Sequence, residues 1–183
     1  MSSIRPALVL LALFTVLTGG LYPAAVTAAA QALFPHQSNG SVHGHGSQLI
    51  GQSFSDPGYF WSRPSATQYN ATASSGSNLG PLNPALAQAV QQRIQALREA
   101  DPGNTAQVPI DLVTTSGSGL DPHISPEAAL YQLARVARVR KLEPALLRTL
   151  IAEHTRGRTL GVLGEPRVDV LGLNLALDGA APR

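Results

Sequence analysis

The chain has 183 residues, of which 44% are hydrophobic and only 13% are charged, and its formal net charge is +2. The basic residues are scattered rather than clustered, which argues against a nucleic-acid partner. Because the chain has no cysteine, it cannot form disulfides, thiolate zinc sites or a cysteine nucleophile. Its length fits one soluble domain beside an apolar segment.

The N-terminal segment is predicted to cross a membrane. No formally charged side chain occurs between Arg5 and Asp56, and residues 7–34 are mostly Leu, Val, Ala, Gly and Thr. As a helix they would rise about 42 Å, more than a hydrocarbon core of roughly 30 Å. Arg5 precedes the run with no acid beside it, so the N-terminus should stay cytoplasmic. We therefore expect a cytoplasmic stub and a single transmembrane helix in residues 1–35.

A cleaved signal peptide is the alternative interpretation of this segment. Its apolar region would span residues 7–17, and a small-residue cleavage site would lie at residues 28–30. Gly19, Gly20 and Pro23 shorten the uninterrupted apolar stretch and favour a signal, whereas the hydrophobicity that continues beyond them favours an anchor. In either case the remainder of the chain is expected outside the cytoplasm.

Residues 36–46, with the sequence HQSNGSVHGHG, are polar and glycine-rich, and we interpret them as a flexible neck. Imidazoles at alternate positions of an extended segment point the same way, so His36, His43 and His45 could hold a divalent metal. A mobile solvated neck is the favoured interpretation, so we predict no metal ligand here.

An extracytoplasmic domain is expected in residues 47–183, and its first half mixes short strands with one helix. Residues 48–54 predict a strand, and residues 56–80 an ordered loop pinned by aromatic rings. Asn83 and Pro84 predict the start of a helix that ends at residues 101–103. Its inward stripe is Leu86, Val90, Ile94 and Leu97.

The second half predicts a strand, two helices and a closing strand. Residues 109–115 have the β-branched composition of a strand. Ser125-Pro126-Glu127 starts a helix to about Arg140, and Glu143-Pro144 starts another that ends near Gly157. The inward residues of these helices are expected to be Leu130, Leu133, Ala134 and Ala137, then Leu146, Leu147, Leu150 and Ile151. With residues 168–177 as a strand, the fold class is α+β, with helices covering one sheet.

The sequence offers little catalytic chemistry. A general acid and base need two titratable groups in one pocket, and the candidates are Asp121, His123, Glu127 and His154. Asp121 lies in a turn where Asp commonly binds backbone amides, and His154 lies beside an apolar stripe, so structural roles are favoured for both. Residues 116–119 lack the first glycine of a nucleophile elbow, and residues 75–81 lack the lysine of a P-loop. We predict no catalytic, cofactor-binding or metal residue.

Two short segments are candidates for contact with a partner protein. Tyr, Trp and Arg are over-represented at interfaces, although core packing is slightly favoured for an aromatic run. Small residues let membrane helices approach closely, although small residues with no partner are equally plausible. The candidate contact residues are Gly19, Gly20 and Tyr22 in the apolar segment, and Tyr59, Phe60, Trp61 and Arg63 in the loop.

The chain resembles, nearly from end to end, the family of C subunits of the bacterial Kdp high-affinity potassium-transporting P-type ATPase. The matching motifs occur in order and together are highly specific. They are RPAL (5–8), GGLYP (19–23), NGS (39–41), LIGQSF (49–54), RPSAT (63–67), SGSNLGPLNP (75–84), DLVTTSGSGLDPHISPEAA (111–129), RVA (135–137), HTRGRTLGVLGEPRV (154–168) and LNLAL (173–177).

This resemblance implies a non-catalytic accessory subunit in the bacterial inner membrane, with its leader retained. The implied partners are a channel-like potassium-translocating subunit, a P-type ATPase catalytic subunit and membrane lipid. The family has been described as assisting ATP binding. The expected topology places the domain away from cytoplasmic ATP, so ATP and potassium are expected to be handled by the partner subunits.

Two other classes of function remain open on the residues alone. An exported hydrolase would have a processed N-terminus and would depend on His123 or His154. A membrane-tethered binding module would have a saturable small-molecule site, although no residue identifies one.

Overall fold

The structure is a computed structural model that describes residues 3–43 and 46–180. The chain divides into two compact units, Met1–His45 and Gly46–Arg183. The first unit carries the apolar helix, and the second is a folded domain with its own hydrophobic core. This organisation agrees with the predicted α+β fold class, in which one N-terminal apolar helix precedes a small mixed domain.

One continuous helix makes up most of the first unit. It consists of α1 (Ile4–Val16), a π-helical turn (Leu17–Leu21) and α2 (Tyr22–Leu33). Across Ile4–Leu33 it has 30 residues and a mean hydropathy of 1.9, and none of the most apolar window is buried within the chain. By length and composition this helix can cross a bilayer, as the sequence predicts.

The π-helical turn explains how the helix continues past Pro23. Proline has no N–H to give to the carbonyl four residues earlier, and its ring crowds that carbonyl. The turn before it is widened, so that the N–H of Tyr22 bonds to the carbonyl of Leu17, five residues back. Gly19 and Gly20 lie in this wider turn and do not end the helix.

A short helix and a short strand follow the apolar helix. Phe34 separates α2 from the single turn α3 (Pro35–Ser38), and β1 comprises Val42–His43. The segment predicted as a flexible neck, residues 36–46, therefore includes regular elements, and residues 44–45 lie outside the described part of the chain.

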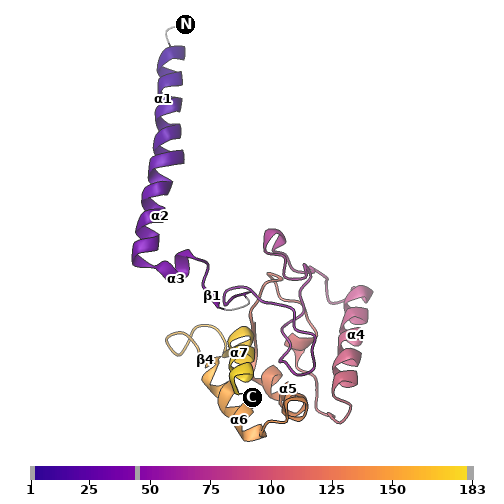
Figure 1. The fold of residues 1–183 in the computed structure, drawn as a ribbon. Helices are drawn as coiled ribbons and strands as arrows, with labels where there is room; N and C mark the ends of the chain where they lie inside the picture. The colour runs from indigo at the N-terminus through magenta and orange to yellow at the C-terminus, as the bar shows by residue number, and fades with distance from the viewer. Residues whose placement is uncertain (1–2, 44–45, 181–183) are drawn as a thin grey trace. The chain divides into compact units, whose positions relative to one another are not determined.

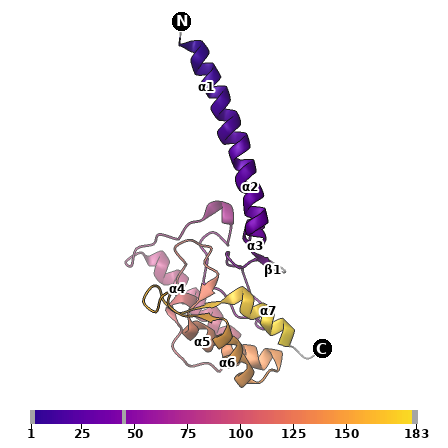
Figure 2. The same ribbon diagram turned by 90° about the vertical axis from the view of Figure 1, so that its left-hand side faces the viewer.

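The domain contains four helices of more than two turns and several short elements, which Figures 1 and 2 label in part. α5 lies between α4 and α6 in both views, and α6 packs on α5 and α7. The elements are β2 (Gly46–Ser47), the 3₁₀ turn η2 (Ala71–Ala73), α4 (Pro84–Ala100), the 3₁₀ turn η3 (Ile110–Leu112), β3 (His123–Ile124), α5 (Pro126–Arg140), α6 (Pro144–Glu153), β4 (Thr155–Arg156), β5 (Arg167–Asp169) and α7 (Val170–Ala180).

Three of these strands form one small antiparallel sheet in the order β3-β5-β4. Ile124 of β3 and Thr155 of β4 both pair with Val168 of the central strand. Val168 has no exposed surface, so the middle of the sheet is part of the hydrophobic core. The helices and this sheet therefore contribute to one hydrophobic core.

Three helices start where proline follows a capping or extended residue, as predicted. The Asn83 side chain accepts from the N–H of Ala85, and the Ser125 side chain accepts from the N–H of Ala128. These bonds satisfy N–H groups that have no partner within the helix. α6 begins after Glu143 without a side-chain cap, yet Pro144 sets its first turn.

The buried face of α5 differs from the predicted one. Leu133 and Ala137 are buried as expected, but Leu130 and Ala134 are exposed. The buried residues are instead Ala128, Ala129, Tyr131, Gln132, Leu133, Arg135, Val136 and Ala137. The predicted inward face is rotated around the helix axis relative to the observed one, because the prediction excluded the polar residues Gln132 and Arg135 from the core.

Two predicted strands are wrong, and a third is mostly helix. Residues 48–54 are irregular, and Gly51 makes a single bond to the carbonyl of Leu120 (2.8 Å). Within residues 109–115 the chain turns through η3, where Asp111 accepts from the N–H of Ser125 (2.7 Å). In residues 168–177 only the start is strand, and the rest is α7.

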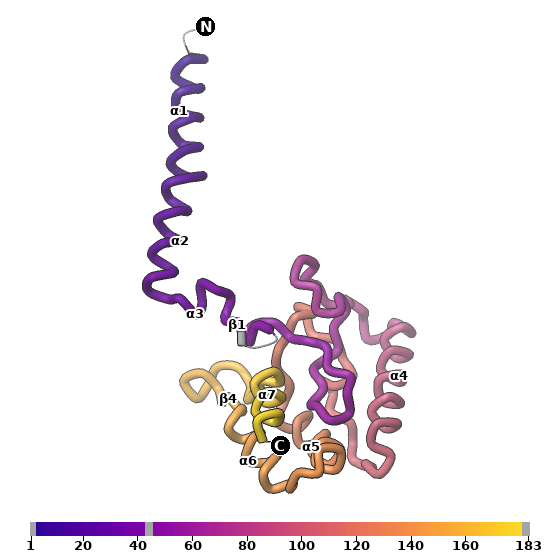
Figure 3. Tube along the Cα trace, viewed as in Figure 1, coloured from indigo at the N-terminus to yellow at the C-terminus, as the bar shows by residue number. Residues whose placement is uncertain are grey.

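The predicted ordered loop at residues 56–80 is confirmed. Figure 3 traces it as a long irregular path across the domain, and its only regular element is η2. Phe60 is completely buried, while Tyr59 and Trp61 pack against the core from its edge. These rings hold the loop in place, as the sequence suggested.

Candidate partner-contact site

The candidate contact residues of the domain lie in residues 56–63, which we call the aromatic segment. Two buried side-chain amides hold its backbone. The Asn174 side chain accepts from the N–H of Phe60 (2.9 Å) and donates to its carbonyl (3.0 Å). The Gln132 side chain accepts from the N–H of Trp61 (2.8 Å) and donates to its carbonyl (3.2 Å). Together the two amides replace the hydrogen bonds that a neighbouring strand would supply.

Arg135 lies beneath the aromatic segment and is almost completely buried. It donates to the carbonyls of Pro57 and Tyr59 and to the Gln132 side-chain oxygen (2.7 Å), and its guanidinium lies 4.5 Å from the Trp61 ring centroid. Burial lowers the pKa of Arg135 to about 10, so the group remains charged at neutral pH. Its charge is balanced by carbonyl dipoles and the indole face.

A second arginine fixes the outer edge of the aromatic segment. Arg140 lies 4.3 Å from the Tyr59 ring centroid, donates to the carbonyl of Gly58 (2.9 Å) and pairs with Asp178 (2.7 Å). The Tyr59 hydroxyl also donates to Asp178 (3.0 Å). Two arginines of α5, Arg135 and Arg140, therefore bind the aromatic segment.

The structure places the predicted contact residues in different settings. Phe60 has no accessible surface in this chain, whereas Tyr59, Trp61 and Arg63 are half-buried. Gly19 and Gly20 belong to the first unit, where, apart from the helix's own backbone, nothing lies within 4 Å of the position that a Cβ would occupy. Tyr22 is exposed on the same helix. The contact roles of all these residues remain predictions.

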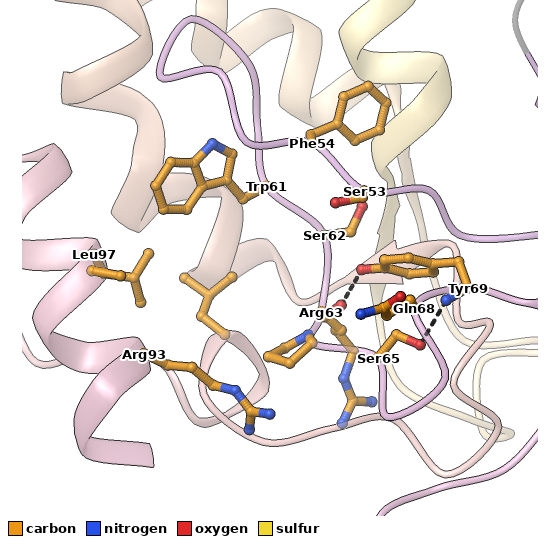
Figure 4. A pocket seen from close by; sticks show the side chains of 13 residues that line it. Ser53, Phe54, Trp61, Ser62, Arg63, Ser65, Gln68, Tyr69, Arg93 and Leu97 are labelled. Carbon is orange, nitrogen blue, oxygen red and sulfur yellow. Dashed lines mark hydrogen bonds between the residues drawn. The ribbon is translucent and has the colours of Figure 1, made fainter. Parts of the chain in front are cut away.

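A cavity of about 590 Å³ opens beside the aromatic segment (Figure 4). Figure 4 shows Trp61, Tyr69, Arg93 and Leu97 around it. The Tyr69 hydroxyl donates to the carbonyl of Arg63, and Arg93 donates to the carbonyl of Val113 (2.7 Å). Burial lowers the pKa of Arg93 and raises that of Tyr69.

The chemistry of this first cavity is limited by its lining. The lining residues include no histidine and no carboxylate. A serine there has no general base within the cavity to take its proton, so the lining does not form a hydrolytic site. The side chains of Ser65, Tyr69 and Arg93 donate hydrogen bonds to backbone carbonyls of the domain.

A second cavity, of about 700 Å³, brings together three of the four acid-base candidates, Asp121, His123 and Glu127. His154 does not line it, and its Nδ1 lies 2.9 Å from the carbonyl of Leu150. Asp121 accepts from the backbone N–H of His123 (3.0 Å) and pairs with Arg63 (3.2 Å).

The pKa of Asp121 indicates a structural role. Burial alone would raise it, but hydrogen bonds from the side chain and backbone of His123 and the charge of Arg63 outweigh burial and hold the pKa below its usual value. One carboxylate oxygen is engaged by His123 and the other by Arg63, so the predicted role of Asp121 as a turn residue is the better interpretation.

Of the three histidines considered as metal ligands, His36 is the one whose side chain lies within the described residues. His36 is exposed at the end of the first unit, whereas His45 and the side chain of His43 lie outside the described residues. Among the residues that the structure describes, no group of three His, Cys, Asp or Glu side chains is arranged to hold a metal.

Sequence reasoning missed the residues that organise the site. Gln132, Arg135 and Asn174 are polar, and hydrophobic patterns exclude such residues from a core. One signal was available, because Val170, Leu173, Asn174 and Leu177 recur at helical spacing and all four are buried. An asparagine on a buried stripe requires a hydrogen-bond partner inside the fold.

The family model described as K+-transporting ATPase, c chain, matches residues 4–179. The chain belongs to this family. It is 66% identical to the potassium-transporting ATPase KdpC subunit of Variovorax paradoxus, over 97% of this chain and 96% of that protein. The KdpC subunit of Methylococcus capsulatus is 61% identical over 95% and 96% of the two chains, and that of Geobacter sulfurreducens is 55% identical over 100% of both.

Membership of the KdpC family confirms the resemblance drawn from the motifs. It identifies the chain as a subunit of a potassium-transporting ATPase and implies partner subunits. The matched residues include both the apolar helix and the domain.

Proposed function

We propose that this chain is a non-catalytic accessory subunit of an ATP-driven high-affinity potassium uptake complex, needed for the assembly and activity of its other subunits. The partners would be a channel-like potassium-translocating subunit and a P-type ATPase catalytic subunit. The main support is membership of the KdpC family. In addition, several polar groups of the domain are engaged in its own fold. Gln132, Arg135 and Asn174 hold the aromatic segment, and Asp121 is paired with Arg63.

The proposed location is the bacterial inner membrane, with one span, the N-terminus in the cytoplasm and the domain outside. The helix Ile4–Leu33 supports the span. Arg5 is the only formally charged residue before Asp56, so the positive-inside rule supports the orientation. The apolar stretch that continues to Leu33 favours a retained leader over a cleaved signal.

The proposed topology also assigns ATP and potassium to the partners. ATP is cytoplasmic, so an outer domain cannot bind it during turnover. A potassium filter needs converging rings of backbone carbonyls, which a single helix cannot build. The chain would act by docking a rigid outer domain on the channel-like subunit, where it stabilises the conducting assembly or shapes ion access.

Reporter fusions and N-terminal sequencing test the topology. A C-terminal alkaline phosphatase fusion should be active and a C-terminal green fluorescent protein dark, because the C-terminus is expected outside. Sequencing of the mature chain should find the N-terminus ahead of the apolar helix. Fluorescence in the cytosol, or a mature start near Ala28–Ala30, would overturn the proposed topology.

Deletion of the domain tests the accessory role. The complex should be purified with the full chain and with a chain that ends after residue 45, which keeps the apolar helix. We expect the truncated complex to lose potassium-stimulated ATPase activity or potassium affinity. Normal values for both would contradict the proposal.

His154→Ala serves as a control in the same complex and should leave ATPase activity intact, since this histidine is not proposed to act in the reaction. His123→Ala is used only for the hydrolase test on the full chain alone. A hydrolytic activity of the full chain alone that either substitution abolishes would favour the exported-hydrolase alternative.

A further inference from the structure

The turn between β4 and β5 exposes three apolar side chains. Figure 1 shows this turn projecting from the domain beside β4. Leu160 is 86% exposed, Val162 71% and Leu163 59%. Residues 159–163, which we call the tip, therefore present a compact apolar surface that nothing else in the described domain covers.

The tip has a defined shape. Thr159 and Leu163 exchange two backbone hydrogen bonds (2.8 and 2.9 Å), and the Arg158 side chain binds both carboxylate oxygens of Glu165 (2.9 and 2.7 Å). These contacts close the base of the turn. The apolar side chains are thus displayed on a braced element.

Leu160 is an unfavourable residue for the isolated fold. Its φ is +54° and that of Gly161 is +76°, as at the two central positions of a type I′ turn. Asparagine is the residue favoured before glycine there, whereas leucine incurs a steric penalty. Leu160 also has almost no contact within the domain to offset the strain and exposure. Strain of this kind points to a role outside the fold.

A cavity adjoins the tip. The 700 Å³ cavity is lined by residues 164–167, which continue directly from the tip, and by Ile110, which is also strongly exposed. Two charged residues of the lining, Glu127 and Arg167, form no ion pair within the described residues. An apolar projection beside a hollow that carries unpaired charges of both signs is complementary to a structured protein surface. A lipid surface has no protrusion to fill the hollow.

We propose that the tip and the adjoining cavity dock on the extracytoplasmic surface of the channel-like subunit. This inference rests on the proposed function and specifies its docking surface. The partner surface receives Leu160, Val162 and Leu163 in an apolar recess, and it inserts a segment with charged side chains between Glu127 and Arg167. Burial of Leu160 in this recess compensates for its cost in the free chain.

Site-specific photo-crosslinking in the complete complex tests this surface. Val162 is replaced by p-benzoylphenylalanine, and the matched control carries the same residue at Leu82, which is 95% exposed outside the tip. We expect an adduct between position 162 and the channel-like subunit, and a much weaker one from position 82. An adduct with lipid alone, with the catalytic subunit, or with no partner would overturn the docking assignment.

Leu160→Asn separates docking from folding. The midpoint of thermal unfolding of the full chain in detergent should be unchanged or higher, since asparagine suits the left-handed turn. Crosslinking from position 162 should fall about 10- to 100-fold, because a leucine side chain is no longer buried at the interface. Leu82→Asn should alter neither value. Undiminished crosslinking in Leu160→Asn would refute the role of the tip.

The test also distinguishes this inference from the proposed function. If the chain co-purifies with its partners and the domain is needed for activity, but position 162 gives no adduct with the channel-like subunit, only the docking surface is wrong. If the chain does not co-purify with the other subunits at all, the proposed function fails as well.

Discussion

Replacing Gln132 by alanine tests whether the aromatic segment is held by buried amides. Gln132 is only 1% exposed, and its side-chain oxygen accepts from both the N–H of Trp61 (2.8 Å) and the guanidinium of Arg135 (2.7 Å). Its amide nitrogen donates to the carbonyls of Trp61 and Ala128 (3.2 Å each). The substitution leaves these groups without their partner and creates a small cavity.

The expected loss of stability follows from these contacts. A buried donor left without an acceptor costs about 1–3 kcal/mol, and hydrogen bonds to charged groups lie at the upper end. With one backbone donor and the Arg135 guanidinium both affected, and a modest cavity term, we expect a loss of about 3–5 kcal/mol. That is a large part of the roughly 5–15 kcal/mol that stabilises a typical domain.

Urea unfolding of the full chain in detergent measures the effect. Trp61 is the only tryptophan, so its fluorescence reports on the segment that Gln132 holds. Gln95→Ala is the matched control, because Gln95 lies on the exposed side of α4 and bonds only Glu99 (2.8 Å). The control should change stability by no more than about 0.5 kcal/mol. A loss below about 1 kcal/mol for Gln132→Ala would refute the proposed role of this amide.

Two further substitutions probe the loop around Asp121. The folded state lowers the pKa of Asp121, so its carboxylate stabilises the fold above the unfolded pKa of about 3.9, and this contribution is lost as pH falls through the lowered value. The difference in unfolding free energy between the wild type and Asp121→Asn should therefore shrink between pH 7 and pH 3, and a constant difference would contradict the assignment. Gly119→Ala should cost about 2–4 kcal/mol, because φ is +69° and a Cβ would lie 2.6 Å from a backbone oxygen. Gly117→Ala, with open space at its Cβ, should be nearly neutral in the same thermal melts, and equal effects at both positions would argue against the steric reasoning.

Local signals in the sequence predicted the helix starts well. Asn83-Pro84, Ser125-Pro126 and Glu143-Pro144 each mark a helix start, because capping and proline geometry act within one turn. The apolar helix was equally evident, since its composition alone determines its preference for lipid. These features depend on neighbours in the sequence and need no knowledge of the tertiary fold.

The closing element was misread because its pattern fits two periods. Val168 and Val170 alternate as in a strand, and β5 does pair there. From Val170 onward the buried positions follow helical spacing. Periodicity alone cannot assign a short apolar run to a strand or to a helix. In the fold, this run is the helix α7, which packs against α6.

The organisation of the site could not be predicted because it depends on long-range contacts. Asn174 and Phe60 are 114 residues apart, and Gln132 and Trp61 are 71 apart. Nothing near the aromatic run indicates which polar side chain will satisfy its backbone. Composition identified the rings as important, but only the fold shows that they rest on two amides and two arginines.

The distance in sequence between Phe60 and Asn174 also has a consequence for biosynthesis. The 114 residues that separate them take roughly 6 to 23 s to translate at about 5–20 residues per second. During that interval Phe60 emerges without α7, the helix that carries Asn174, and a prematurely terminated chain never acquires it. The backbone of Phe60 therefore gains its side-chain partner only after the last helix is made.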